Sequence, residues 1–314
     1  MNPRTLAWLV LNHVPGAGAV TLRRLVSGVG SPEATLQASV EQLVAIGSLS
    51  PAQAQELKRL AAGVGDFEDL AADLQRRGTH LLTFEDESYP SNLRALRDAP
   101  PLLYVRGSLL ARDHTAVAVI GTRTPSDGGI AATTAIARGL ADRDVTIVSG
   151  LARGVDGAAH RGALEAGRTI AVLGSGIDRV TPQRHHRLAQ EITRRGALLS
   201  EIPPGARASR EALLARNRIQ AGLAKAVVVA QCRSRGGSFA TARRALAAAR
   251  SVLAVRWDET EFADGPKRLG ELGARVVSAS DAVDLAAEAA FKPLPPSPQR
   301  EIALDDPAQR PLGE

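Results

Sequence analysis

The sequence is poor in aromatic residues and in cysteine, and it contains no long apolar run. Only 3% of its 314 residues are aromatic, so few side chains are available to stack on the bases of a single strand. The single cysteine, Cys232, excludes an internal disulfide and a multi-cysteine metal site, as is usual in a reducing compartment. No segment reaches the roughly 18 apolar residues of a spanning helix, and Met1–Arg4 does not resemble the start of a signal peptide. We therefore expect a cytoplasmic protein without a membrane segment.

Several signatures of cofactor and catalytic sites are missing or incomplete. Gly174–Arg179 lacks the third glycine of a dinucleotide fingerprint, and a phosphate-binding loop with Gly-Lys-Ser/Thr is absent. Ser149 lacks the Gly-x-Ser-x-Gly elbow of a serine hydrolase. Asp156 and His160 share a helix face and could hold a metal, but without a third ligand a helix cap and a packed histidine are favoured. His185 and His186 are predicted to be surface residues. The motifs thus predict no cofactor and no metal.

Positive charge is present, and it is concentrated in one segment. The formal net charge is +6. Residues 207–250 contain ten basic side chains and one acidic side chain, which gives this segment +9 and leaves −3 for the rest. Any single arginine there is more readily interpreted as solvated on a helix face. The cluster as a whole indicates a protein that binds nucleic acid.

Apolar spacing predicts an α/β protein with a helical start. Residues 1–75 show helical periodicity, interrupted at Val14–Gly18 by a turn like that of helix-hairpin-helix and sterile-alpha-motif-like modules. Such turns can bind DNA phosphates through backbone amides, but we favour a packing role. Residues 76–290 are predicted to form the second domain. The proline-rich residues 291–314 are predicted to be a disordered tail.

Regular alternation of strands and helices in the second domain predicts a doubly wound, parallel, Rossmann-like sheet. The predicted strands are His80–Phe84, Leu102–Val105, Val117–Ile120, Val145–Ser149, Thr169–Leu173, Ala197–Leu199, Ala226–Ala230 and Val252–Val255. The predicted helices are 128–142, 155–166, 184–195, 211–223, 238–250 and 281–290. The first two strands are expected to extend the main sheet. We place Val252–Val255 at its far end, where an exposed edge favours pairing with a second copy.

Glycine and small polar residues follow most of these strands. The turn after Val117–Ile120 contains Gly121, Thr122 and Arg123, at the position where an open α/β sheet binds ligands. Backbone N–H groups and the planar guanidinium of Arg123 suit a phosphate. Similar turns follow at Ser149–Asp156, Gly174–Asp178, Ser200–Gly205 and Gln231–Ser238. We expect them to form one crevice, because the carboxyl ends of parallel strands share one edge.

These motifs resemble those of the DprA/Smf family of DNA-processing proteins. The resemblance is carried by Ala118–Ser126, Val148–His160, Val172–Asp178, Gly196–Gly205, Arg216–Leu223 and Gly236–Ala242, and it spans nearly the whole chain. It implies a non-enzymatic protein that binds single-stranded DNA during natural transformation, loads the RecA recombinase onto it, and forms a homodimer. The DNA site that it implies comprises Gly121, Thr122, Arg123, Ser149, Gly150, Asn217, Arg218, Arg235, Gly236, Gly237, Ser238 and Phe239.

The chain departs from the family pattern at several positions, among them Gln231 for a usual glutamate and Gly236 for a usual serine. Phe239 is the one aromatic residue of the basic segment, so it could stack on an unpaired base. It could equally pack inward, as the family's usual leucine does. The alternative function is a phosphoribohydrolase-like enzyme of the lysine-decarboxylase-like fold, but Gly236–Arg244 lacks that signature's second glycine and its glutamate.

Overall fold

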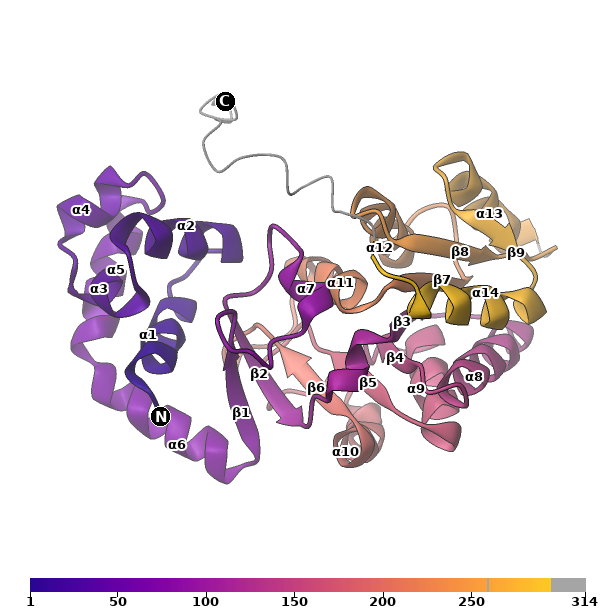
Figure 1. Cartoon of the computed structure of the whole chain (residues 1–314), viewed down its shortest axis with the longest axis horizontal. Coiled ribbons are helices and arrows are strands. Elements are labelled where there is room, and N and C mark those ends of the chain that lie inside the picture. The colour runs from indigo at the N-terminus through magenta and orange to yellow at the C-terminus, as the bar shows by residue number, and fades with distance from the viewer. Residues whose placement is uncertain (259, 295–314) are drawn as a thin grey trace.

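The computed structural model describes residues 1–258 and 260–294, and the proline-rich segment from residue 295 onward lies outside this part. Figure 1 shows a cluster of helices at one end of the molecule and a sheet flanked by helices over the remainder. Within the described residues, no helix is both long and apolar enough to cross a membrane. The predicted fold class is confirmed, because the sheet is mostly parallel and a helical region precedes it.

The helical region contains six helices, and the first strand follows it. The helices are α1 (Pro3–Asn12), α2 (Ala19–Val29), α3 (Pro32–Gln37), α4 (Val40–Ala45), α5 (Pro51–Ala62) and α6 (Val64–Arg76). Ser39 and Ser50 close capping boxes with Gln42 and Gln53, which explains where α4 and α5 begin. The predicted turn at Val14–Gly18 lies between α1 and α2.

The helical region shares a hydrophobic cluster with the sheet. Trp8 and Leu11 of α1 belong to the same buried cluster as Tyr104 and Leu198. The Tyr104 hydroxyl also donates a hydrogen bond to Asn12 Oδ1 at 3.0 Å. Packing against the sheet is therefore one role of the helical region. The predicted division of the chain at residue 75 into separate domains remains a prediction.

The sheet has nine strands in the order β1-β2-β6-β5-β4-β3-β7-β8-β9. They are β1 (Thr79–Thr83), β2 (Leu102–Gly107), β3 (Ala116–Gly121), β4 (Thr146–Ser149), β5 (Thr169–Val172), β6 (Ala197–Ser200), β7 (Ala226–Gln231), β8 (Ser251–Val255) and β9 (Arg275–Val277). Strands β3 to β9 pair in parallel. β1 and β2 extend the sheet as predicted, and they do so antiparallel. The order in which strands are added to the sheet reverses between β3 and β7, because β4 to β6 lie on one side of β3 and β7 to β9 on the other.

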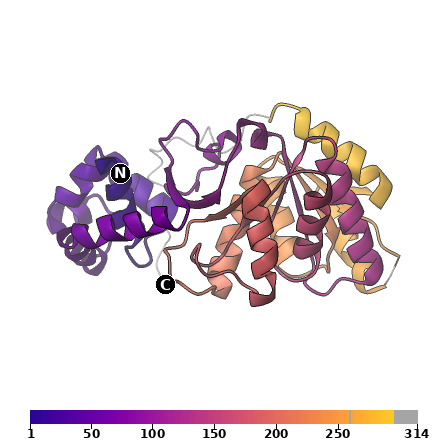
Figure 2. The same ribbon diagram turned by 90° about the horizontal axis from the view of Figure 1, so that it is seen from below.

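Helices cover both faces of the sheet, as Figure 2 shows from below. One face packs against α7 (Ser91–Arg94), α11 (Arg210–Leu223), α12 (Gly237–Ala247) and α13 (Thr260–Glu271). The other face packs against α8 (Asp127–Ala141), α9 (Val155–Ala166), α10 (His186–Arg195) and α14 (Ala279–Phe291), together with the helical region. The middle strands are buried on both sides, which is why β3 and β7 consist almost entirely of apolar residues.

The far end of the sheet differs from the prediction. Val252–Val255 lies in β8, which pairs with β9 and is therefore not the edge strand. β9 has only three residues, too few to produce a periodic pattern. α13 also went unpredicted, because Pro266 lies inside it and weakens the helical signal of the sequence. The edge strand at this end of the described sheet is therefore β9, one strand beyond the predicted one.

Candidate nucleic-acid interface

A cleft of about 750 Å³ lies at the carboxyl ends of β3 and β7, the two parallel strands between which the strand order of the sheet reverses. Open α/β sheets bind ligands at this position, because the loops leaving the two strands turn toward opposite faces and leave space between them. The lining residues come from the end of β3, from the loops after β3, β4 and β7, from the segment before α11, and from α9, α11 and α12. They are Ile120, Gly121, Thr122, Arg123, Ala152, Asp156, Ala208, Ser209, Arg210, Leu213, Leu214, Arg216, Asn217, Gln220, Arg233, Arg235, Gly236, Gly237, Ser238 and Thr241.

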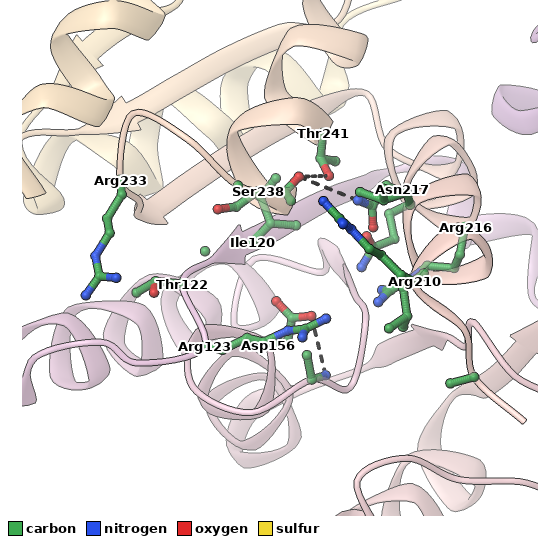
Figure 3. Close-up of a pocket in the computed structure, with 18 of the residues that line it drawn as sticks. Ile120, Thr122, Arg123, Asp156, Arg210, Arg216, Asn217, Arg233, Ser238 and Thr241 are labelled. Carbon is green, nitrogen blue, oxygen red and sulfur yellow. Dashed lines mark hydrogen bonds between the residues drawn. The ribbon is translucent and has the colours of Figure 1, made fainter.

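The cleft brings together most of the residues predicted for the DNA site. These are Gly121, Thr122, Arg123, Asn217, Arg235, Gly236, Gly237 and Ser238. Asn217 lies across from the start of α12, where its Nδ2 donates to the Gly237 carbonyl at 3.5 Å. Figure 3 shows Arg210, Arg216 and Asn217 on one side, with Arg123 and Asp156 below and Ser238 and Thr241 above.

Ser149 and Gly150 of the predicted site do not line the cleft. The Ser149 side chain is fully buried and its hydroxyl donates to the Val119 carbonyl at 2.7 Å, which joins β4 to β3. Gly150 lies beneath the Arg216 guanidinium: a Cβ on Gly150 would be 1.5 Å from Arg216 Nη1. Ser149 thus supports the sheet and Gly150 supports the position of Arg216, and a contact of either residue with DNA stays a prediction.

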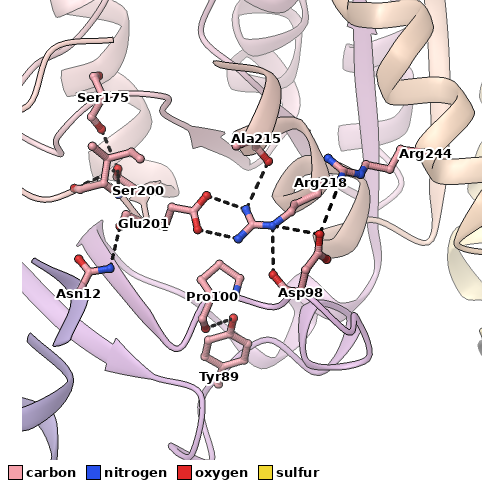
Figure 4. A network of polar contacts seen from close by, with 11 residues as sticks. Asn12, Tyr89, Asp98, Pro100, Ser175, Ser200, Glu201, Ala215, Arg218 and Arg244 are labelled. Carbon is pink, nitrogen blue, oxygen red and sulfur yellow. Dashed lines mark hydrogen bonds and ion pairs between the residues drawn. The ribbon is translucent and has the colours of Figure 1, made fainter. Parts of the chain in front are cut away.

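Arg218 is also absent from the cleft lining. Its guanidinium donates to both carboxylate oxygens of Glu201 at 2.6 Å and to the Asp98 carbonyl at 3.0 Å, as Figure 4 shows. Only 7% of the residue is exposed. The backbone carbonyl of Glu201 in turn accepts a hydrogen bond from Asn12 at 3.2 Å. Arg218 thus joins α11 to the segment after β6 and, through it, to α1, and its charge is already neutralised.

Phe239 packs inward. It is partly buried against the hydrophobic cluster on the α11–α12 face of the sheet and does not line the cleft. Of the two interpretations of the sequence, the structure favours the one in which Phe239 takes the place of a core leucine. No aromatic side chain occurs among the lining residues in the described part of the chain.

Arg216 and Gln220 form part of the cleft floor and were not predicted. They lie one helical turn apart on α11, and 4% of Arg216 and 2% of Gln220 is exposed. Within the described residues, Arg216 Nε and Nη1 and Gln220 Nε2 are buried without a hydrogen-bond partner. A buried unpaired donor costs about 1–3 kcal/mol, so such groups are unusual. The i, i+4 spacing could have indicated a shared helix face, but nothing in the sequence showed that this face turns toward the cleft.

Asp156 is the acidic side chain of the cleft floor. It accepts a hydrogen bond from the Ala152 N–H at 3.4 Å, in the loop before α9. The N-cap of α9 is Gly154 and no side chain caps this helix, so the cap predicted for Asp156 is not formed. Burial raises the pKa of Asp156, and the Arg216 charge opposes that shift. Burial likewise lowers the pKa of Arg216, and the Asp156 charge opposes this change. The two charges therefore act on each other across the floor.

The rim of the cleft carries exposed positive charge. Arg123, Arg210 and Arg235 are exposed. Arg233 pairs with Glu261, and Figure 3 places it far from Arg216. Charge at the rim remains partly hydrated, so it can attract an anion without the cost of full burial. The cleft thus has a cationic rim and a floor on which the charges of Asp156 and Arg216 offset each other.

Backbone geometry keeps the two central loops close together. A Cβ on Gly121 would lie 2.5 Å from Val155 and 2.6 Å from the Gln231 carbonyl. Gly236 has φ +125°, a conformation that favours glycine, and it is the N-cap of α12 without a side-chain cap. Gln231, the departure from the usual glutamate, accepts from the Ser126 N–H and donates to Ser126 Oγ, both at 3.0 Å. It therefore ties the end of β7 to the start of α8.

The two histidines near α9 are both buried. His160 Nδ1 lies 2.7 Å from Thr169 Oγ1, as expected for a packed histidine. His185 was predicted at the surface, but it is 7% exposed and its Nδ1 lies 2.9 Å from the Leu151 carbonyl. The prediction for His185 is wrong because it forms the turn before α10, which folds back over the Leu151 loop. His186 is exposed as predicted. In the described residues, no group of three or more metal-ligating side chains is found.

Comparison with known proteins identifies the family. Residues 80–288 match the family model of DNA recombination-mediator protein A. The chain is 33% identical over 282 residues to protein Smf of Synechocystis, covering 88% of this chain and 71% of that protein. The X-ray structure of DNA processing protein A from Streptococcus pneumoniae matches with a TM-score of 0.74 and 30% identity, over 88% of this chain and 95% of that one.

A second solved structure is DNA processing protein A from Helicobacter pylori, described for its unique single-stranded DNA binding mode. It matches with a TM-score of 0.60 and 30% identity, covering 67% of this chain and 96% of that one. The family model extends over the sheet that carries the cleft. The chain therefore belongs to the DprA/Smf family of DNA-processing proteins.

Proposed function

We propose that the cleft between β3 and β7 binds single-stranded DNA. The observation that carries this proposal is the cationic rim of Arg123, Arg210 and Arg235 around the open first turn of α12. Unpaired N–H groups at a helix start favour an anion, and guanidinium groups match phosphate oxygens. The single-stranded DNA binding described for the Helicobacter pylori relative supports the same assignment.

A single strand fits this site better than a duplex. The cleft is recessed between loops, so a flexible strand can bring its phosphates to the rim and turn a base inward. A duplex presents its phosphates on a stiff convex cylinder that cannot follow the recess. We therefore expect single strands to bind more tightly than double strands of the same length. The test is a titration of fluorescently labelled oligonucleotides, single and double, at one fixed salt concentration. Equal affinity for both would contradict the proposal.

The proposal treats the cleft as a binding site without catalysis. Asp156 is a carboxyl group in the cleft with a raised pKa, the property expected of a general acid. However, it also holds the Ala152 turn, and the glutamate of the phosphoribohydrolase signature is absent from the sequence. Incubation with nucleoside monophosphates separates the two functions, because release of free base would assign the cleft to an enzyme.

We further propose that the protein loads RecA onto the bound strand as a homodimer in the cytoplasm. The family description as a recombination mediator supports the first part. For the dimer, β9 ends the described sheet and offers an edge for pairing with a second copy. The rate at which RecA coats single-stranded DNA, with and without the protein, tests loading. Light scattering at micromolar concentration tests the dimer, and a monomeric mass would contradict it.

A further inference from the structure

A second cavity, the α12 pocket, lies at the opposite edge of the sheet from the cleft. It has a volume of about 340 Å³ and lies between residues 96–98, α11 and α12. Ala247 and Ala248 line it from the end of α12. Because α12 leads directly into the parallel strand β8, this end lies at the amino edge of the sheet, whereas the cleft lies at the carboxyl edge. The α12 pocket is thus separate from the cleft, and its volume is that of a small ligand pocket.

The α12 pocket combines an apolar wall with a cationic rim. The wall consists of buried apolar side chains, namely Leu96, Ala221 and Ala248. The exposed Arg97 and Arg244 form the rim, with Asp98 3.8 Å from Arg244. Arg218 also lines the pocket, but Glu201 neutralises it. Asp98 therefore faces two arginines at the rim, which leaves an excess of positive charge beside an apolar wall.

The sequence contains a segment with the matching chemistry, outside the described residues. Residues 301–306 read Glu-Ile-Ala-Leu-Asp-Asp, which places three acidic and two large apolar side chains in six positions. In an extended peptide every second side chain points to the same face, so Ile302 and Leu304 can enter a pocket together. The carboxylates can then stay at the rim, where they keep part of their hydration. Charge and polarity thus match residues 301–306 to the α12 pocket.

The last described helix ends at the same edge of the sheet as the α12 pocket. α14 follows β9 and runs back along the sheet, and its Asp284 pairs with Arg143, which lies just before β4. Figure 1 shows α12 and α14 ending on the same side of β8. The two helices cover opposite faces of the sheet, so their axes are about 20 Å apart. Residues 295–300 span about 20 Å when extended, so residues 301–306 can reach the pocket of their own chain.

We propose that residues 301–306 dock in the α12 pocket of their own chain, with Ile302 and Leu304 on its apolar wall and their carboxylates at Arg97 and Arg244. Attachment through a short linker gives the segment an effective concentration in the millimolar range, so a few weak contacts are enough to hold it. Docking braces the ends of α11 and α12, the two helices that also line the cleft.

Disulfide trapping in the full chain tests this contact. Ala303→Cys places one thiol on the segment, and Ala247→Cys places another at an exposed position of the α12 pocket. The native Cys232 does not compete, because burial raises the pKa of its thiol to about 12. We expect the intramolecular disulfide to form about tenfold faster than when Ala303→Cys is combined with a control cysteine. The controls are Ala131→Cys, an exposed position on α8, and Thr122→Cys at the cleft.

Charge reversal at the rim gives a second measurement on the same trapped pair. Arg97→Glu should slow disulfide formation about threefold, whereas Arg24→Glu, at an exposed position on α2, should leave the rate unchanged. Equal rates for all three cysteine pairs, or equal rates in the two charge variants, would overturn the proposal. Faster trapping at Thr122→Cys would place the segment at the cleft instead. Disulfide-linked dimers whose formation rises with protein concentration would assign the pocket to a second copy and also overturn it. None of these measurements uses DNA, so their outcome is independent of the proposed function.

Discussion

The Arg216 guanidinium occupies the space that a side chain at position 150 would need, since a Cβ on Gly150 would lie 1.5 Å from Arg216 Nη1. Gly150→Ala must therefore displace Arg216 from the cleft floor. We expect weaker binding of oligothymidylate together with a loss of stability of about 1–3 kcal/mol, as for other overpacked cores. Denaturant unfolding and oligonucleotide titration measure the two effects.

Gly65→Ala is the control for this substitution. A Cβ on Gly65 meets nothing within 4 Å, and the residue lies inside α6. Alanine there should leave binding unchanged and raise helix stability by about 0.5–1 kcal/mol. If Gly150→Ala binds DNA and unfolds like the wild-type protein, then neither binding nor stability requires the observed position of Arg216.

Arg123 and Arg235 are expected to contact one phosphate each. Arg123→Ala and Arg235→Ala should each weaken binding of every single-stranded sequence and reduce the slope of log affinity against log salt by about 0.7. Arg187→Ala, an exposed arginine on α10, serves as the control with an unchanged slope. Affinity measured between low and moderate salt gives the slopes. Unchanged slopes in both cleft variants, with folding intact, would remove these residues from the site.

Arg218 should affect stability and not the salt dependence of binding. Arg218→Ala leaves the Glu201 carboxylate, 15% exposed, without its partner, so we expect a loss of about 3–5 kcal/mol. Arg59→Ala breaks a pair with Glu56 of similar geometry whose arginine side chain is 71% exposed, and its effect should be small. Chemical denaturation of both variants makes the comparison. If folded Arg218→Ala shows a reduced slope of log affinity against log salt, Arg218 belongs to the DNA site.

Phe239 is expected to behave as a core residue. Phe239→Ala should lower the free energy of unfolding by about 1–3 kcal/mol, less than the ~3–5 kcal/mol of a fully buried phenylalanine. Phe239→Leu should cost under about 1.5 kcal/mol. Both variants should keep the wild-type ratio of single-strand to double-strand affinity. A selective loss of single-strand affinity in Phe239→Ala would instead show stacking on a base.

The buried histidine His160 makes stability depend on pH. Burial lowers the pKa of His160 from 6.5 to about 3, so the folded protein keeps it neutral while the unfolded chain takes up a proton below about pH 6.5. The contribution of neutral His160 to the free energy of unfolding is complete above pH 6.5 and is lost progressively as the pH falls toward 3. The expected slope is about 1.4 kcal/mol per pH unit. Denaturation at pH 7 and pH 5 should show this loss diminished in His160→Gln and retained in His186→Gln, a change at an exposed position.

Much of the sheet could be predicted because its strands are buried on both faces. β3 and β7 are continuous apolar segments bounded by glycine or polar residues, and the helices between strands keep a clear periodicity. β9 was missed because its three residues are too few to show a periodic pattern. α13 was missed because Pro266 interrupts its helical pattern. Local sequence signals thus predict an element only where it is long enough and free of breaking residues.

The site was predicted in part for a different reason. Glycine and arginine after a strand indicate a turn at the binding edge, so Arg123 and Arg235 could be placed from sequence. The direction of a helical side chain depends on how that helix packs, which explains why Arg218 was predicted in the cleft and Arg216 was missed. Arg216 and Arg218 are two positions apart on α11 and therefore point to different neighbours, which only the tertiary structure identifies.

The pairing of β3 with β7 also bears on how the protein is made. Val117 pairs with Ala226, and the cleft lining extends from Ile120 to Thr241. During synthesis, β3 to β6 can assemble with α8 to α10 while the partner of β3 is still untranslated, and such distant pairings form late. The nascent chain therefore exposes one side of its central strand until β7 leaves the ribosome. The residues that line the cleft are complete only once Thr241 of α12 has been synthesised, after all residues of β1 to β6.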